Sequence, residues 1–143
     1  MILYCDTSAL VKCHCREVGS DAVLALRGQA EATAISVIGY SEFHSAINRK
    51  RRDGDISPRE AERILHNFEA DWESLVRVEV TAGLNEIAAR LLKDHPLRAF
   101  DALHLASALL LRNRMRQTDV SFSGFDDKQR LAAARERLPV VPV

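Results

Sequence analysis

Short apolar runs alternate along this chain with longer stretches in which apolar residues recur at helical spacing. The runs at residues 2–5, 33–37 and 120–123 have the length of strands, and the first is apolar throughout, as in a strand buried on both faces of a sheet. Residues 76–80 alternate between apolar and charged side chains, which predicts a half-exposed strand. Helical patterns follow each segment, so this order predicts an α/β fold with a central, mainly parallel sheet sandwiched by helices.

Capping residues set the expected ends of several of these helices. Ser57 is followed three positions later by Glu60, which is the pattern of a capping box at the start of a helix. Thr7 or Ser8 is expected to cap the first helix of the chain. A short edge strand is expected at residues 139–141.

Length and composition restrict the class of protein. A chain of 143 residues suits one domain that spans residues 1–143. Twenty basic residues balance twenty acidic ones, so a nucleic acid would have to be held by a local patch or through a bound cation. The three cysteines lie in the first fifteen residues and form no disulfide framework. No run is long enough to span a bilayer, so we expect a cytoplasmic protein without a membrane partner.

The most unusual position is Asp101, at the head of a helical stretch that is apolar on almost every side. Such a helix belongs in a core, where an unpaired charge is costly. Three further acids follow predicted strands or the turns after them: Asp6, Glu42 and Asp126. Because the carboxyl ends of parallel strands meet at one edge of a sheet, the four carboxylates could share one crevice. Taken singly, Asp6 could equally be a helix cap and Glu42 a surface residue.

A cluster of four carboxylates indicates a bound cation. Carboxylates that are forced together raise one another's pKa unless a cation neutralises them. Oxygen ligands without histidine or cysteine favour Mg²⁺ or Mn²⁺. Such ions retain water and accept phosphate oxygens, as in metal-assisted phosphodiester cleavage. In this hypothesis Asp6 and Asp101 hold the ion most tightly, and Glu42 and Asp126 are further ligands or orient its water.

Other polar residues near these acids have expected supporting roles. Ser8 could hydrogen-bond Asp6 or a water molecule on the ion. His104 lies one turn beyond Asp101 and is expected to pack beside the site rather than to act as a general base. The helix that carries Glu42 ends in four consecutive bases: Arg49, Lys50, Arg51 and Arg52. Two interpretations of these bases are open, contact with an RNA backbone or a purely structural interaction with the helix dipole.

Together, these residues resemble a known family. Asp6-Thr7-Ser8 after the first strand, a glutamate soon after the second, and the segment Asp101-Ala102-Leu103-His104-Leu105-Ala106 are similar to PIN-domain ribonucleases. The short chain resembles the VapC toxins of toxin–antitoxin pairs over nearly its full length. The resemblance implies a three-layer α/β/α sandwich that is active with Mg²⁺ or Mn²⁺ and usually dimeric. It also implies endonucleolytic cleavage of cellular RNA, arrest of translation, and inhibition by a cognate antitoxin that inserts a segment into the acidic groove.

By the same resemblance, the metal-binding acids of the family map onto Asp6, Glu42, Asp101 and Asp126. Family members often carry threonine or serine two positions before the fourth acid, where this chain has glycine, so Asp127 and Asp119 are alternatives for that position. Two other functions remain open, a non-catalytic binding module that kept the fold and a metal-dependent nuclease that cleaves DNA.

Overall fold

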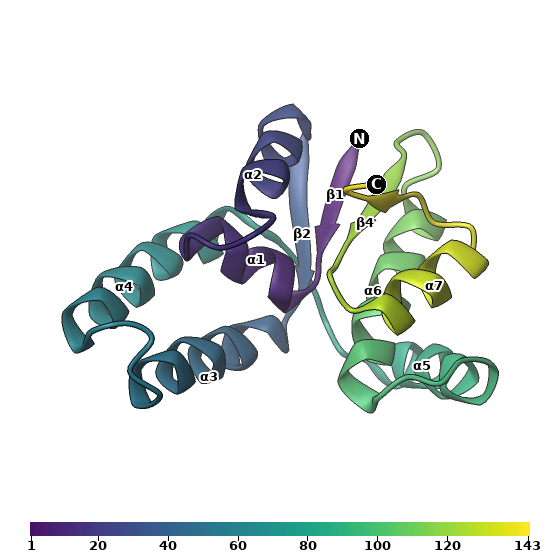
Figure 1. Cartoon of the computed structure of the whole chain (residues 1–143). Coiled ribbons are helices and arrows are strands. Elements are labelled where there is room, and N and C mark those ends of the chain that lie inside the picture. Colours follow the sequence, from purple (N-terminus) through teal and green to yellow (C-terminus); the bar gives the residue numbers. More distant parts are fainter.

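The structure, a computed structural model, describes residues 1–143 and contains seven helices and five strands (Figure 1). The strands are β1 (Ile2–Cys5), β2 (Ala32–Ser36), β3 (Val76–Val78), β4 (Val120–Ser123) and β5 (Val140–Val141). The helices are α1 (Thr7–His14), α2 (Ser20–Gln29), α3 (Gly39–Arg52), α4 (Pro58–Ser74), α5 (Ala82–Asp94), α6 (Ala99–Arg114) and α7 (Asp127–Arg135). None of the helices is both long and apolar enough to cross a membrane.

The five strands form one sheet in the order β3-β2-β1-β4-β5, and every neighbouring pair is parallel. Helices α1 to α4 cover one face of this sheet and α5 to α7 cover the other (Figure 1). The predicted α/β/α sandwich with a parallel central sheet is therefore confirmed. All strands consequently end at the same edge, which is the lower edge in Figure 1.

Alternating side chains of β1 enter separate cores on the two faces of the sheet. Ile2 and Tyr4 pack with residues of α5, α6 and α7, whereas Leu3 and Cys5 pack with residues of α1 and α2. This explains why the first apolar run has no polar position, since both faces of β1 are covered. A further cluster joins α3 and α4, where the rings of Phe43 and Phe68 stack with their centroids 3.8 Å apart.

Several element ends differ from those expected. The first helix is capped by the Asp6 side chain, which accepts a hydrogen bond from the Ala9 amide, and not by Thr7 or Ser8. Asp6 directly precedes α1, so its side chain, unlike those of Thr7 and Ser8, is placed to accept from an amide of the first turn. The third strand is shorter than expected, since β3 covers only 76–78 of the predicted residues 76–80. The capping box at the start of α4 and the short strand near the C-terminus are confirmed.

Helix α3 begins against β2 with almost no space between them. A Cβ atom on Gly39 would lie 2.4 Å from Cδ1 of Ile35, which is fully buried. Glycine is thus required for this close approach, and it sets the position from which α3 carries Glu42 toward the edge of the sheet.

Candidate active site

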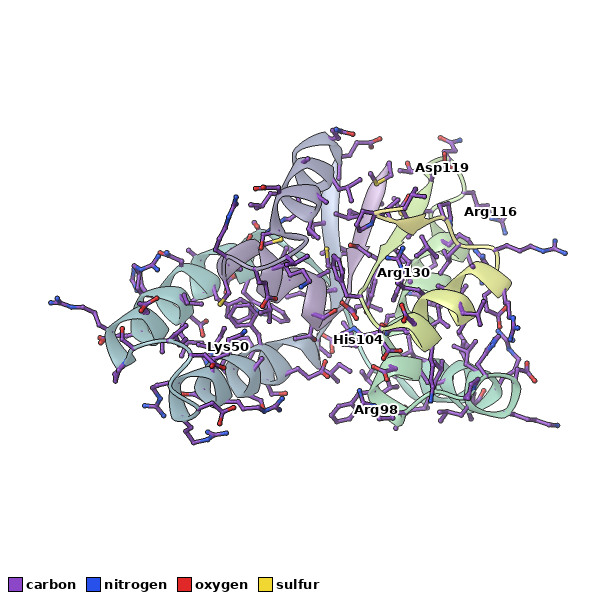
Figure 2. All side chains as sticks on the ribbon, in the orientation of Figure 1. Lys50, Arg98, His104, Arg116, Asp119 and Arg130 are labelled. Atoms are coloured by element: carbon purple, nitrogen blue, oxygen red, sulfur yellow. The ribbon has the colours of Figure 1, made fainter.

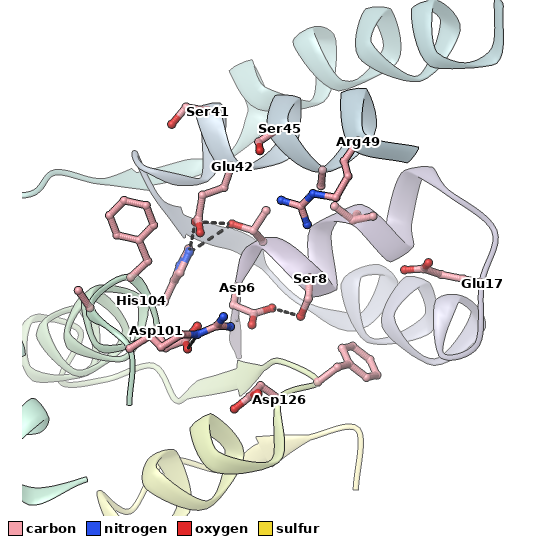
Figure 3. Close-up of a pocket in the computed structure, with 17 residues that line it drawn as sticks. Asp6, Ser8, Glu17, Ser41, Glu42, Ser45, Arg49, Asp101, His104 and Asp126 are labelled. Carbon is pink, nitrogen blue, oxygen red and sulfur yellow. Dashed lines mark hydrogen bonds and ion pairs between the residues drawn. The ribbon is translucent and has the colours of Figure 1, made fainter. Parts of the chain in front are cut away.

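The carboxyl ends of the strands open into a cleft of about 1100 Å³ (Figure 3). Its lining includes the four acids singled out in the sequence, Asp6, Glu42, Asp101 and Asp126. Asp6 follows β1, Glu42 and Asp101 lie in the first turns of α3 and α6, and Asp126 directly precedes α7. The parallel topology brings these four positions to one place, although they are as far apart in the chain as residues 6 and 126.

Asp6 lines this cleft and is almost completely buried. Its Oδ1 accepts hydrogen bonds from the Ser8 hydroxyl at 2.7 Å and from the Ala9 amide at 2.9 Å, while Oδ2 accepts none. Burial raises the pKa of Asp6 above its ordinary value and Asp101 adds to this effect, although His104 and the two hydrogen bonds oppose it. The expected contact of Ser8 with Asp6 is present. Asp6 is both a helix cap and a cleft residue, so the two interpretations of its role are compatible.

Glu42 is held by hydrogen bonds to a single one of its oxygens. The Thr7 hydroxyl donates to Oε1 at 2.7 Å, and Nε2 of His104 lies 2.6 Å from the same atom. Burial alone would raise the pKa of Glu42, but the hydrogen bond and charge of His104, together with Thr7, outweigh it and lower that pKa. Glu42 is therefore an ionised carboxylate whose Oε2 has no partner within the chain.

His104 is buried beside this cleft on α6. Its Nδ1 lies 2.9 Å from the Tyr4 hydroxyl, and its Nε2 lies 3.2 Å from the Thr7 hydroxyl in addition to its contact with Glu42. Both ring nitrogens thus have partners within the protein. This geometry favours the packed, carboxylate-orienting role over that of a general base, because a base needs a free nitrogen facing the substrate.

One buried residue connects Asp101 with Asp126. The backbone amide of Gln129 donates to the Asp126 side chain at 2.9 Å, and its side-chain Nε2 donates to the backbone carbonyl of Asp101 at 3.2 Å. Asp126 is itself exposed, and the Asp101 side chain is 22% exposed. Gln129 therefore fixes the start of α7 against the first turn of α6.

Gly124, two positions before Asp126, lies close to Asp6 and Phe122. A Cβ atom at this position would lie 3.0 Å from Oδ2 of Asp6 and 2.9 Å from Cε1 of Phe122. The absence of a side chain leaves the unbonded oxygen of Asp6 uncrowded on this side.

Asp119 and Asp127 were the alternatives to Asp126 as the fourth acid, and neither of them lines the cleft. Asp119 precedes β4, at the edge of the sheet opposite to the cleft (Figure 2). Asp127 lines a smaller neighbouring pocket and not this cleft, whereas Asp126 lines both. Position therefore favours Asp126 as the fourth acid, and its function stays a prediction.

The four consecutive bases do not act as one patch. Arg49 lines the cleft, while Lys50 lies outside its lining and forms an ion pair at 3.2 Å with Glu17, a residue of the lining. Arg51 and Arg52 are exposed and lie outside the cleft lining. Of these four bases, only Arg49 is placed to meet a substrate at the acids.

The donor set of the cleft suits a hydrated Mg²⁺ or Mn²⁺. No three of the histidine, cysteine, aspartate and glutamate side chains converge closely enough to surround an ion directly. Mg²⁺, however, is usually held by one or two carboxylates and keeps several water molecules. The unbonded oxygen of Asp6 and the carboxylate of Asp101 are hard oxygen donors of this kind, in a cleft wide enough for the remaining water.

Three residues of this site were not identified from the sequence. Tyr4, Thr7 and Gln129 each contact a residue far away in the chain. A weak signal existed for Gln129, because it is a polar residue at helical spacing with the apolar Ala132 and Ala133. A tyrosine inside an otherwise apolar strand was a similar signal at Tyr4, since a buried hydroxyl needs a partner.

The class of protein follows from comparison with known families. Residues 3–119 match the model of the PIN domain. The chain belongs to the PIN-domain family. The matched segment contains Asp6, Glu42 and Asp101 and ends before Asp126.

The chain is also similar to individual proteins of known sequence or structure. Two Mycobacterium tuberculosis proteins, ribonuclease VapC45 and ribonuclease VapC49, are each 35% identical to this chain over 108 residues, which cover 76% of the chain and 75% of either protein. Among solved structures, FitAcB from Neisseria gonorrhoeae has a TM-score of 0.68 at 14% identity and covers 99% of this chain and 97% of its own. VapC20 from Mycobacterium tuberculosis, a Sarcin-Ricin loop cleaving toxin, has a TM-score of 0.64 at 18% identity, with 91% and 94% covered.

Proposed function

We propose that this protein is a Mg²⁺- or Mn²⁺-dependent endoribonuclease, the toxin of a type II toxin–antitoxin pair, which cleaves cellular RNA and thereby inhibits translation. The observation that carries the proposal is the buried carboxylate of Asp6, with one unbonded oxygen, in a cleft shared with Glu42, Asp101 and Asp126. Burying an ionisable carboxylate close to another is unfavourable without a cation. The likeness to proteins named ribonuclease VapC supports RNA as the substrate.

Asp6 and Asp101 would hold the cation, which when bound supplies the Lewis acidity that activates water and neutralises phosphate charge. Ser8 and the Ala9 amide occupy one oxygen of Asp6, which leaves the other free and would let it bind the ion. Thr7 and His104 occupy one oxygen of Glu42 in the same way, and its free oxygen would bind the ion or accept a hydrogen bond from its water. Asp126, which lies across the cleft from Glu42 in Figure 3, would orient a second water molecule.

RNA cleavage with defined ends tests the proposed reaction. Purified protein with Mg²⁺ should cleave RNA and leave matched DNA intact, and the products should carry 5′-phosphate and 3′-hydroxyl ends because water is the nucleophile. End-group analysis of labelled oligonucleotides measures this outcome. Products with 2′,3′-cyclic phosphate ends would rule out water as the nucleophile, and faster cleavage of DNA would favour the DNA nuclease.

The proposal extends to partners and location. We expect a cytoplasmic homodimer that is inhibited by an antitoxin with a basic side chain in the acidic cleft. Solved structures of similar fold include VapBC2 from Rickettsia felis, which has a TM-score of 0.65 at 15% identity and covers 98% of this chain and 97% of its own. A small reading frame beside the gene should encode the antitoxin, and adding its product should stop cleavage.

The position of Arg49 predicts a specific role in substrate binding. Arg49→Ala should raise KM for RNA about three- to tenfold and lower the salt dependence of binding by about one counterion, because the side chain lines the cleft and would contact a phosphate. The matched control is Arg52→Ala, an exposed position on the same helix outside the cleft, which should change neither quantity. Equal effects of both substitutions would show that the bases attract RNA only through their overall charge.

A further inference from the structure

Tyr4 has a hydroxyl group that its packing does not require. The side chain is fully buried in β1, and its ring stacks on Phe122 with centroids 5.8 Å apart. A phenylalanine would make the same ring contacts. A hydroxyl group in an apolar core is costly unless it is hydrogen-bonded, and burial raises the pKa of Tyr4 well above its ordinary value. The role of the Tyr4 hydroxyl group must therefore lie in its hydrogen bonds.

The first partner of the hydroxyl is the backbone at the end of β2. The Ser36 amide donates to the Tyr4 oxygen at 3.0 Å, and the Ser36 hydroxyl in turn accepts from the Ile38 amide at 3.3 Å. Helix α3 begins at the next residue and presents Glu42 in its first turn. Tyr4 thus holds the turn that positions the helix of Glu42.

The second partner is Nδ1 of His104, at 2.9 Å. On the other side of the ring, Nε2 faces Oε1 of Glu42 at 2.6 Å. An ionised carboxylate only accepts hydrogen bonds, so Nε2 must carry a proton. The Tyr4 hydroxyl can donate to Nδ1 of a neutral ring or accept from Nδ1 of a charged one, so it fixes the orientation of the ring in either state.

We propose that Tyr4 is a positioning residue of the cation site, and that it acts on Glu42 through both the His104 ring and the turn after β2. This inference rests on the proposed function, because it assigns Tyr4 a role toward the cation. The two connections start at one hydroxyl group and converge on one carboxylate, whose free oxygen belongs to the cleft. Groups that orient metal-binding carboxylates from behind typically change metal affinity or activity about 10- to 100-fold when they are removed.

The alternative is that the hydroxyl only satisfies the buried Ser36 amide and has no effect beyond stability. Tyr4→Phe separates the two, because it removes the hydroxyl and keeps the ring. Mn²⁺ affinity is measured by calorimetry without RNA, the His104 ring by ¹⁵N NMR, and cleavage as separate kcat and KM. The control is Tyr40→Phe, which removes the hydrogen-bonded hydroxyl of a tyrosine on α3 whose partner is Glu69 and which lies outside the cleft lining.

We expect Tyr4→Phe to shift the Nδ1 resonance of His104, to weaken Mn²⁺ binding at least about tenfold, and to lower kcat with little change in KM. Tyr40→Phe should leave all of these values as in the wild type. Unchanged Mn²⁺ affinity and an unchanged His104 resonance in folded Tyr4→Phe would overturn the inference and leave the proposed ribonuclease intact. A wild-type protein that neither binds Mn²⁺ nor cleaves RNA would instead overturn the proposed function, and the NMR comparison would still decide whether Tyr4 fixes the ring.

Should Tyr4→Phe fail to fold, the wild-type protein alone tests the inference. The Tyr4 hydroxyl proton should exchange slowly with solvent and correlate with Nδ1 of His104 across the hydrogen bond. A His104 ring whose two nitrogens average rapidly would show that Tyr4 does not hold it.

Discussion

Asp6→Asn is expected to abolish RNA cleavage while leaving the protein folded. Asparagine keeps the shape of the side chain and is as good a helix cap as aspartate, so α1 should still begin at Thr7. The substitution removes the negative charge that would hold the cation. Loss of several kcal/mol of transition-state stabilisation corresponds to about a thousandfold or greater decrease in kcat. Cleavage assays at saturating Mg²⁺ measure this decrease, and circular dichroism checks the fold.

The stability of the same variant should change in the opposite direction to its activity. Because burial raises the pKa of Asp6, the folded protein disfavours the ionised carboxylate, and the wild type should gain stability as the pH falls through that raised value. Asparagine carries no charge at any pH, so metal-free Asp6→Asn should be at least as stable as the wild type at pH 7 and should lose this pH dependence. Asp55→Asn, at an exposed position, is the control for activity and stability alike. A fully active Asp6→Asn would show that the site has been placed wrongly.

Removal of divalent cations is the second change with a large expected effect. Cleavage should fall to background in a chelator and return when Mg²⁺ or Mn²⁺ is added in excess. The cation should also stabilise the folded protein, by about 2.7 kcal/mol at a concentration one hundred times its Kd, because the unfolded chain offers no such site. Thermal melts with and without Mn²⁺ measure this stabilisation directly.

The comparison of two variants makes the cation experiment specific. Mn²⁺ should raise the melting temperature of the wild type and of Asp55→Asn, and should have little effect on Asp6→Asn. Cleavage that survives the chelator would contradict a metal mechanism and would make His104 a candidate for acid–base chemistry instead. An equal Mn²⁺ effect on all three proteins would place the ion elsewhere on the surface.

Much of the fold could be predicted because its signals are local. The apolar run before Asp6 and the capping box at Ser57 each need only a few neighbouring residues to be recognised. The grouping of the four acids was also predictable, because parallel strands all end at one edge. The individual roles of the four acids were harder to predict. The choice of Asp126 over Asp119 required knowing which end of β4 faces the cleft.

The parts that could not be predicted depend on contacts between distant residues. Nothing in the local sequence indicates that His104 meets Tyr4 and Glu42, since these partners lie 100 and 62 positions away. Lys50 belongs to a run of four bases, yet it is paired with Glu17 and lies outside the lining of the cleft. Helical periodicity alone cannot reveal such a choice of partner, because it identifies the face of a helix and not what that face meets.

Because the two faces of the sheet have separate cores, the protein should lose its activity before it unfolds completely in heat or denaturant. Glu42 is carried by α3, whose apolar side chains pack with α4 and α1, whereas Asp101 lies on α6 in the other core. Because local opening of a protein costs less free energy than global unfolding, we expect α3 and α4 to detach while α5, α6 and α7 stay packed. Such an opening separates the acids and leaves most of the helical structure intact. Heat or denaturant should then inactivate the protein before it unfolds, and the inactivation should be reversible.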